Sequence, residues 1–238
     1  MAESVTRVLE KHEIPYMITL GTLLGAIRHG GFIPWDTDFD LHMFDETYDD
    51  GIEVLRENLP ESLFLEDERS EPLYFHGWAH VKDTKSELIN ERYPQDNVYS
   101  HHGLSLDLYR LHKTMKKDVM DYINSENKKY ILRRYNKGLM SEEEYRDRIE
   151  GLEKSIKEKT VVGDYDADRV VYGMVSPYKK KYIEIDDIFP MKRYQFEDTM
   201  FWGPKNADNI LESIYGDYMQ LPSKERISRR LSIEVKIW

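Results

Sequence analysis

The sequence predicts an α+β protein with a mixed-sheet core, a helical insertion and no internal repeat. In the first half, short apolar segments typical of strands alternate with amphipathic segments. A long span without proline follows, in which apolar side chains recur every three or four residues. The hydrophobic share of 40% is large enough to bury a core despite 33% charged residues. We expect a core at 1–112, a helical insertion at 113–160, and C-terminal elements at 161–238 that pack back on the core as one structural unit.

The first half contains two expected helices, at 3–13 and 48–59. Each has apolar residues at helical spacing, and each ends before a proline, Pro15 or Pro60, because proline lacks the N–H that a helix interior needs. An apolar segment at 16–20 follows the first helix. The expected strands are 39–44, 63–66, 74–81 and 104–111.

Two helices are expected over 114–160, with a break near Lys137 and Gly138. The second helix would begin with Ser141 as its cap and Glu144 as the capping-box partner. Nearer the C-terminus the sequence predicts a hairpin at 194–202, a helix at 206–215 and a loop at 216–222.

Charge and composition exclude several classes of function. The 34 Lys and Arg residues stand against 45 Asp and Glu, so the net charge is -11, which argues against nucleic acid as a partner. The chain has no cysteine, so disulfides, thiol catalysis, zinc fingers and iron–sulfur clusters are excluded, and a metal must bind oxygen or imidazole. No apolar run approaches the roughly 20 residues of a membrane span, and the N-terminus does not resemble a signal peptide. We expect a cytoplasmic protein.

The first half of the insertion is locally basic. Between 113 and 137, eight Lys and Arg residues stand against Asp118, Asp121 and Glu126. Such a stripe is usually a solvated helix face. The alternative is peripheral contact with an anionic lipid surface, which would place the protein at the inner face of the membrane, or with the acceptor.

The stretch 21–43, GTLLGAIRHGGFIPWDTDFDLHM, carries the most chemical information. Asp36, Asp38 and Asp40 are spaced by two, so in an extended chain their carboxylates project to one face. Three neighbouring carboxylates repel one another, which raises the pKa of at least one unless a divalent cation holds them ionised. Oxygen ligands of this kind favour Mg²⁺ or Mn²⁺. The simpler alternative is an acidic turn that leads into a strand.

Two further features strengthen the metal hypothesis. Gly21 and Thr22 end an apolar segment just before a short helix, LLGAIRH, and backbone N–H groups at such a turn can bind phosphate. Asp107 lies in the middle of an apolar, strand-like run, where an isolated charge is costly to bury. The glycine turn followed by Asp38 and Asp40 resembles the pattern of polymerase β-type nucleotidyltransferases, which expects a third carboxylate on a later strand. Asp107 fits that position; the alternative is an ordinary edge-strand aspartate.

The resemblance to one family is closer still. GTLLGAIRHGGFIPWDTDFDL is similar to the signature of the LicD family of phosphocholine transferases, which are related to fukutin and fukutin-related protein. Two later segments resemble the family as well: HGLSLDLYRL, which contains Asp107, and IYGDYMQLP at 214–222. There are two departures. Thr37 interrupts the acidic run, although it should point away from the metal face, and His42 is bulkier and more polar than usual there.

The resemblance implies a nucleotidyltransferase-like fold and transfer of phosphocholine from CDP-choline to a hydroxyl of a cell-surface glycan, with a lipid-linked acceptor as one form. Asp38, Asp40 and Asp107 would hold two ions, Mg²⁺ or Mn²⁺. Asp107 would also take the proton of the acceptor hydroxyl, with His102 as the rival base. The other residues expected to contact substrate are Gly21, Thr22, Arg28, Trp35, Asp36 and Lys82, with Arg28 the best candidate and Lys82 a weaker one for the phosphates.

Choline carries a quaternary ammonium, which aromatic side chains bind. Trp35 stands beside the aspartates, and Trp78, Tyr93 and Tyr99 lie between the motifs. Three alternatives stay open. The donor could be another CDP-alcohol (ethanolamine, glycerol or ribitol), the protein could be a true nucleotidyltransferase that uses an NTP, or it could be a binding module without turnover.

Overall fold

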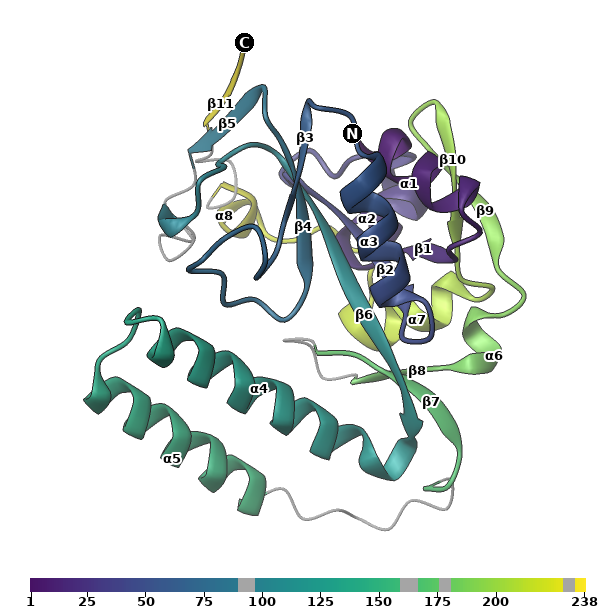
Figure 1. Cartoon of the computed structure of the whole chain (residues 1–238). Coiled ribbons are helices and arrows are strands. Elements are labelled where there is room, and N and C mark those ends of the chain that lie inside the picture. The colour runs from purple at the N-terminus through teal and green to yellow at the C-terminus, as the bar shows by residue number, and fades with distance from the viewer. Residues whose placement is uncertain (90–96, 159–166, 176–180, 229–233) are drawn as a thin grey trace.

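The fold is built on a mixed sheet whose strands come from all parts of the chain (Figure 1). The computed structural model describes residues 1–89, 97–158, 167–175, 181–228 and 234–238. The central path of the sheet is β1 (Tyr16–Ile18), β2 (Asp38–Phe44), β6 (Ser105–Met115), β4 (Ala79–Asp83) and β3 (Leu63–Glu66). β2 and β6 run parallel, whereas the other neighbours on this path are antiparallel. The predicted α+β class is confirmed.

One face of the sheet is covered by α1 (Ala2–Lys11) and α3 (Tyr48–Asn58). Successive side chains of a strand point to opposite faces, and the face of β2 with Phe39, Leu41 and Met43 is buried in the main core. Gly51 of α3 lies so close to this face that a Cβ there would come 2.2 Å from the Cε of Met43. The alternate residues of β2, which include both of its aspartates, therefore point to the other face.

Helix α2 (Leu20–His29) connects β1 to β2 and begins earlier than the sequence predicts. Gly21 and Thr22 were expected in a turn before the helix, but they lie in its first turn. Thr19 is extended and Leu20 has a positive φ of 44°, so the chain changes direction before Gly21. The first turn of α2 is therefore directed at β2.

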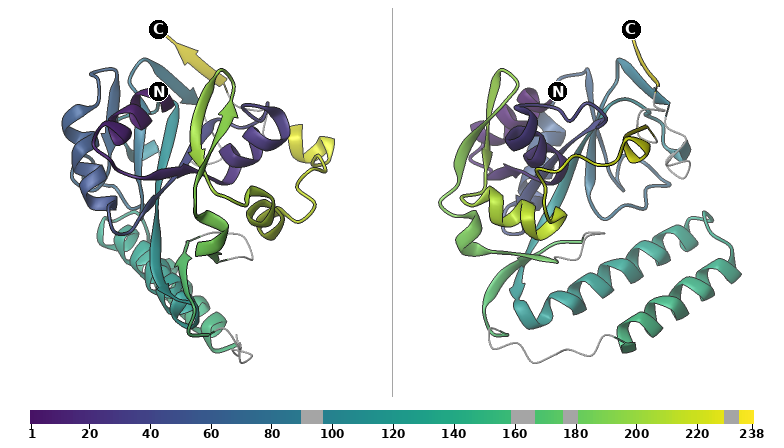
Figure 2. Two further views of the ribbon diagram at one scale, coloured as in Figure 1. Left: turned by 90° about the vertical axis from the view of Figure 1, so that its right-hand side faces the viewer. Right: turned by 180° about the vertical axis from the view of Figure 1, so that it is seen from behind.

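The helical insertion follows the long strand β6. A short 3-10 turn (Lys116–Asp118) leads into α4 (Val119–Asn136) and then α5 (Glu142–Glu158), so the two predicted helices are confirmed; positions 159–160 lie outside the described residues. The Ser141 hydroxyl accepts the Glu144 N–H at 3.1 Å, which is the predicted cap. The two helices lie side by side at one end of the molecule, beyond the end of β6 (Figures 1 and 2).

The C-terminal elements return to the core. β7 (Val170–Gly173) pairs with the end of β6, and the predicted hairpin and helix are present as β9 (Lys192–Phe196), β10 (Thr199–Gly203) and α7 (Ala207–Tyr215). The remaining elements are β5 (Ser86–Ile89), β8 (Tyr182–Glu184), α6 (Ile185–Ile188), α8 (Lys224–Ser228) and β11 (Glu234–Ile237). The sequence analysis missed the short strands β5, β7, β8 and β11. None of the described helices is long and apolar enough to cross a membrane.

One predicted strand is much shorter than expected. The sequence places a strand over 74–81, but β4 begins only at Ala79. Tyr74 and Phe75 are buried in a separate cluster with Tyr99, and the Tyr74 hydroxyl donates to the Trp78 carbonyl. Aromatic packing therefore holds residues 74–78 in a loop, and they do not pair as part of a strand.

Candidate active site

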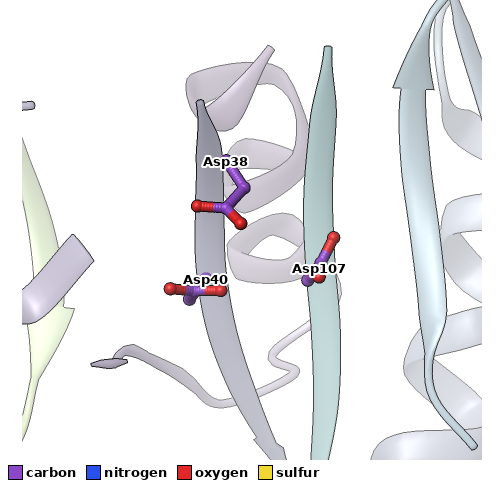
Figure 3. A group of neighbouring side chains, drawn as sticks. All are labelled: Asp38, Asp40 and Asp107. Carbon is purple, nitrogen blue, oxygen red and sulfur yellow. The ribbon is translucent and has the colours of Figure 1, made fainter. Parts of the chain in front are cut away.

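Three carboxylates meet on the face of the sheet that α1 and α3 leave uncovered. Asp38 and Asp40 lie on β2 and Asp107 on the adjacent strand β6 (Figure 3). Asp40 and Asp107 are register partners in the parallel pair, so their side chains share one face. One carboxylate oxygen from each of the three residues lies within 4.8 Å of the others. The structure thus brings together the three residues that the sequence predicts as metal ligands.

The first turn of α2 fixes Asp40. The Gly21 N–H donates to Asp40 Oδ2 at 3.1 Å, and the Asp40 N–H donates to the Thr22 hydroxyl at 2.7 Å. Gly21 leaves no room for a side chain, because a Cβ there would lie 2.5 Å from Asp36 Oδ2. Gly21 and Thr22 were expected to contact substrate. In the structure the Gly21 N–H holds the Asp40 carboxylate and the Thr22 hydroxyl holds the Asp40 backbone, at the helix end where the macrodipole favours negative charge.

Two of the carboxylates favour their neutral form. Burial, together with the charges of Asp36 and Asp107, raises the pKa of Asp38 to about 8. Burial and the charges of Asp38 and Asp107 likewise raise the pKa of Asp40 well above its ordinary value, although the Gly21 N–H opposes the shift. A bound cation would reverse this, because it stabilises the ionised carboxylates.

Asp107 is ionised more easily than its two neighbours. Burial opposes its ionisation, but the nearby His80 and Lys82, with hydrogen bonds from Ser105 and Tyr109, outweigh burial and lower the pKa of Asp107. Ser105 donates to Oδ1 at 2.8 Å and Tyr109 to Oδ2 at 3.0 Å. Both oxygens of Asp107 are thereby oriented.

This donor set fits a hard divalent cation. It offers three carboxylates on two strands, and burial together with neighbouring negative charge raises the pKa of two of them. Repulsion among ionised carboxylates at this spacing is costly in a buried site, and a divalent ion relieves it. The acidic cluster can therefore bind a metal ion.

A cavity of about 760 Å³ opens above the carboxylates. Asp38 and Asp107 line it, as do the predicted substrate residues Lys82 and His102, whereas Asp40 is only 6% exposed. The size is typical of small-molecule sites, which span roughly 300–1,000 Å³. Aromatic side chains form much of the wall: Trp78, Tyr99, Tyr109, Tyr122 and Tyr130.

Of the seven predicted substrate residues, Lys82 and His102 line this cavity, whereas Gly21, Thr22, Arg28, Trp35 and Asp36 are not among the described residues of its wall. Arg28 donates to the Tyr218 carbonyl at 2.7 Å, and Trp35 packs edge-on against His29 with ring centroids 5.9 Å apart. Asp36 lies at the edge of the cluster, where its charge raises the pKa of Asp38. Tyr93 lies outside the described residues. The contact between Arg28 and Tyr218 joins the first and last of the three segments on which the family resemblance depends.

Helix α4 forms the wall opposite the sheet, through Tyr122, Glu126, Asn127, Tyr130 and Arg133. The basic residues of the predicted stripe have partners within the chain. Lys113 pairs with Glu46 at 3.0 Å, Lys129 with Glu126 at 2.7 Å, and Arg133 donates to the Phe75 carbonyl at 3.0 Å. The contacts of Lys113 and Arg133 fasten this stretch to the core, whereas the pair of Lys129 and Glu126 lies within α4. These partners favour the structural interpretation of the stripe over lipid contact.

The sequence analysis missed two buried residues of the site, Glu66 and His80. They lie on β3 and β4, and His80 is the register partner of Asp107. The glutamate that ends the apolar run in LFLE and the histidine between Ala79 and Val81 in AHVKD were the signals that could have indicated them.

The sequence of the chain is similar to a known protein family and to individual relatives. The family described as "LicD/FKTN/FKRP, nucleotidyltransferase domain" matches residues 13–136, which contain all three aspartates. A lipopolysaccharide cholinephosphotransferase, LicD from Haemophilus influenzae, is 25% identical over 234 residues, covering 91% of this chain and 86% of the relative.

Two other relatives match over shorter stretches. The ribitol 5-phosphate transferase FKRP from Mus musculus is 49% identical over 43 residues, covering 18% of this chain and 9% of that protein. An uncharacterized protein of Rickettsia prowazekii, RP689, is 23% identical over 142 residues, covering 52% of this chain and 50% of its own length. The names of two of these relatives, a cholinephosphotransferase and a ribitol 5-phosphate transferase, thus refer to different transferred groups.

Proposed function

This chain belongs to the LicD/FKTN/FKRP family of nucleotidyltransferase domains, and we propose on that basis that it transfers phosphocholine from CDP-choline to a hydroxyl of a cell-surface glycan or its precursor. The observation that carries the proposal is the cluster of Asp38, Asp40 and Asp107, whose carboxylate oxygens converge within 4.8 Å beside a large cavity. A nucleotidyltransferase-like fold accords with carboxylates on adjacent parallel strands.

The proposed reaction is an in-line displacement at the phosphorus that bears choline. The acceptor oxygen forms a new O–P bond, the anhydride bond to CMP breaks, and the hydroxyl proton passes to a base. Bound Mg²⁺ or Mn²⁺, two ions in our proposal, would neutralise the diphosphate charge and lower the pKa of the acceptor hydroxyl. Asp38, Asp40 and Asp107 would hold the ions.

The remaining residues of the cavity would orient the reactants. Asp107 is the proposed base because it lines the cavity and its lowered pKa keeps it ionised and able to accept a proton, with the exposed His102 at the cavity as the rival. Lys82 lines the cavity near Asp107, which supports a role in binding phosphate. Arg28 is engaged with the Tyr218 carbonyl and would have to exchange that partner to bind phosphate.

The aromatic wall supports choline as the transferred head group. Trp78 and Tyr109 lie with ring centroids 5.0 Å apart, and His76 lies 4.8 Å from Trp78. A quaternary ammonium has no hydrogen to donate, so ring faces are its natural partners. Similarity to a cholinephosphotransferase over 91% of the chain supports the same transferred group.

Ribitol phosphate is the second candidate group, because the 43 residues shared with FKRP are 49% identical. CDP-ethanolamine, CDP-glycerol and an NTP remain further alternatives from the sequence. A lipid-linked acceptor, a cytoplasmic location and action at the inner membrane face likewise stay predictions.

The deciding experiment measures CMP release from CDP-choline with Mg²⁺ or Mn²⁺, with and without glycan fractions from cell surfaces. CDP-ribitol, CDP-ethanolamine and CDP-glycerol serve as competing donors. Metal-dependent CMP release that one glycan fraction stimulates would support the proposal and identify the donor. Pyrophosphate release from an NTP, with no CMP from any CDP-alcohol, would overturn it in favour of a nucleotidyltransferase. Ligand binding without turnover would indicate a binding module.

A further inference from the structure

A row of four polar side chains crosses the sheet beneath the cavity. Asp40 is the register partner of Asp107, Asp107 of His80, and His80 of Glu66. The row therefore runs over four adjacent strands, β2, β6, β4 and β3. Register partners of a sheet point to the same face, so the two residues that the sequence analysis missed continue the line of carboxylates.

His80 is held in a defined orientation by Glu66. Its Nδ1 lies 2.9 Å from Glu66 Oε2, and the carboxylate can only accept, so Nδ1 carries the proton of this hydrogen bond. Glu66 is fully buried, and His80 is 5% exposed. A carboxylate behind the first nitrogen leaves the second, Nε2, to act as a ligand, which is the usual arrangement for histidines that bind metals.

The second nitrogen faces Asp107. Nε2 of His80 lies 3.9 Å from Asp107 Oδ1, which is too far for a hydrogen bond. Two atoms that each bind one ion at about 2.1 Å lie roughly 3.0 Å apart at a right angle and about 4.2 Å apart on opposite sides, so an ion between these two atoms fits with a wide ligand–metal–ligand angle. Both residues line the cavity.

The burial of Glu66 accords with a positive charge on the far side of His80. Among the residues that the structure describes, none forms a hydrogen bond with the buried Oε1 of Glu66, and its Oε2 contacts His80. A carboxylate removed from water is costly unless a positive charge compensates it. An ion bound to His80 would supply that charge through the imidazole.

We propose that His80, oriented by Glu66, is a nitrogen ligand of an ion that it shares with Asp107. Asp107 would then lie between two ion positions, one formed with Asp38 and Asp40 and the other with His80. The first has only oxygen ligands and suits Mg²⁺, whereas the second contains imidazole, which favours Mn²⁺ and other transition metals over Mg²⁺. This inference rests on the proposed metal-dependent function for its context, and its test does not depend on turnover.

The test is pulsed EPR of the whole protein loaded with Mn²⁺, which detects the nuclear spin of a directly bound nitrogen, together with a Mn²⁺ binding isotherm. We expect nitrogen coupling in the wild type and its loss in His80→Gln. The isotherm should fall from two bound ions to one in that variant. Glu66→Gln keeps the imidazole but should weaken the nitrogen-containing position about 10–100-fold.

The matched control is His102→Gln, because His102 lines the same cavity but is exposed. Nitrogen coupling should survive in it. Absence of nitrogen coupling in the wild type, or its persistence in a folded His80→Gln, would overturn the proposal. If His80→Gln does not fold, His80→Asn and Glu66→Gln decide, and Mn²⁺ affinity unchanged in Glu66→Gln would overturn it.

The measurement also separates this proposal from the proposed function. Nitrogen coupling without CMP release would leave the ligand assignment intact and overturn the transferase. CMP release from a protein without nitrogen coupling would overturn the ligand assignment and leave the transferase intact.

Discussion

Asp40 and Asp107 face each other across two parallel strands, although a long stretch of chain separates them. Their partnership depends on the register of β2 and β6, because a shift of one residue would turn one of the two side chains to the opposite face. The hydrogen bonds of Asp40 to Gly21 and Thr22 then tie the same point to helix α2. The site is thus formed by α2, β2 and β6 together.

Asn in place of Asp40 is expected to lower turnover at least about 10³-fold, because it removes one charge from the ion-binding cluster. The fold should persist, since Asn can still accept the Gly21 N–H. Asp36→Asn is the matched control. Asp36 borders the cluster without belonging to the three converging carboxylates, so its loss should cost only about tenfold. Steady-state CMP release measures both, and near-normal turnover in Asp40→Asn would contradict the assignment.

In the metal-free protein, the contribution of Asp38 to stability should fall as the pH rises from about 4 to about 8. The pKa of Asp38 is raised to about 8, whereas that of an unfolded aspartate is about 3.9. The folded state therefore holds a proton that the unfolded state has lost, and the stability from this proton is present below pH 4 and lost as the pH passes 8.

Asp38→Asn removes that dependence. With EDTA present, the variant should gain on the order of 1 kcal/mol over the wild type at pH 8 and little at pH 4. Thermal unfolding at both pH values measures the difference. Excess Mn²⁺ should stabilise the wild type more than the variant. A pH-independent difference between the two proteins would count against the raised pKa.

A methyl group at Gly21 should disturb the site more than the fold. A Cβ there would lie 2.5 Å from Asp36 Oδ2 and 3.3 Å from Asp40 Oδ2, so Gly21→Ala must displace these carboxylates. We expect Mn²⁺ affinity and turnover to fall at least tenfold, with a loss of about 1–3 kcal/mol in stability.

Gly151→Ala provides the comparison. Gly151 lies in α5, and no atom of the described part of the chain would lie within 4 Å of a Cβ there. Alanine should stabilise this helix by about 0.5–1 kcal/mol without altering Mn²⁺ binding. Chemical denaturation and a Mn²⁺ isotherm measure both variants. Unaltered affinity in Gly21→Ala would show that the carboxylates tolerate displacement.

Trp78→Leu should separate a cationic head group from a neutral one. Trp78 lines the cavity and packs against Tyr109, and loss of a cation–π contact worth about 1–2 kcal/mol raises the KM for CDP-choline roughly tenfold. The KM for CDP-ribitol, whose head group is uncharged, should change much less.

Trp35→Leu is the matched variant, since Trp35 packs on His29 outside the cavity lining. It should leave the ratio of the two KM values as in the wild type. A ratio that shifts in Trp35→Leu but not in Trp78→Leu would favour the aromatic contact predicted from the sequence over the one that the cavity suggests.

The sequence by itself determined the class of the fold, the helices of the insertion with the Ser141 cap, and the three aspartates. Period-two spacing on β2 and an isolated charge in an apolar strand are local signals, so they can be recognised without coordinates. The family resemblance also lies in contiguous segments, and the family match over residues 13–136 bears out the first two of the three.

Only the tertiary structure decided which residues meet. In the folded chain, Gly21 and Thr22 form hydrogen bonds with Asp40, and Arg28 donates to the Tyr218 carbonyl. Glu66 and His80 lie in the same row across the sheet as Asp107. These relationships depend on strand order and register, which join distant parts of the chain. No local pattern encodes them, because a side chain's partner across a sheet is set by pairing between strands and not by its own neighbours in the sequence.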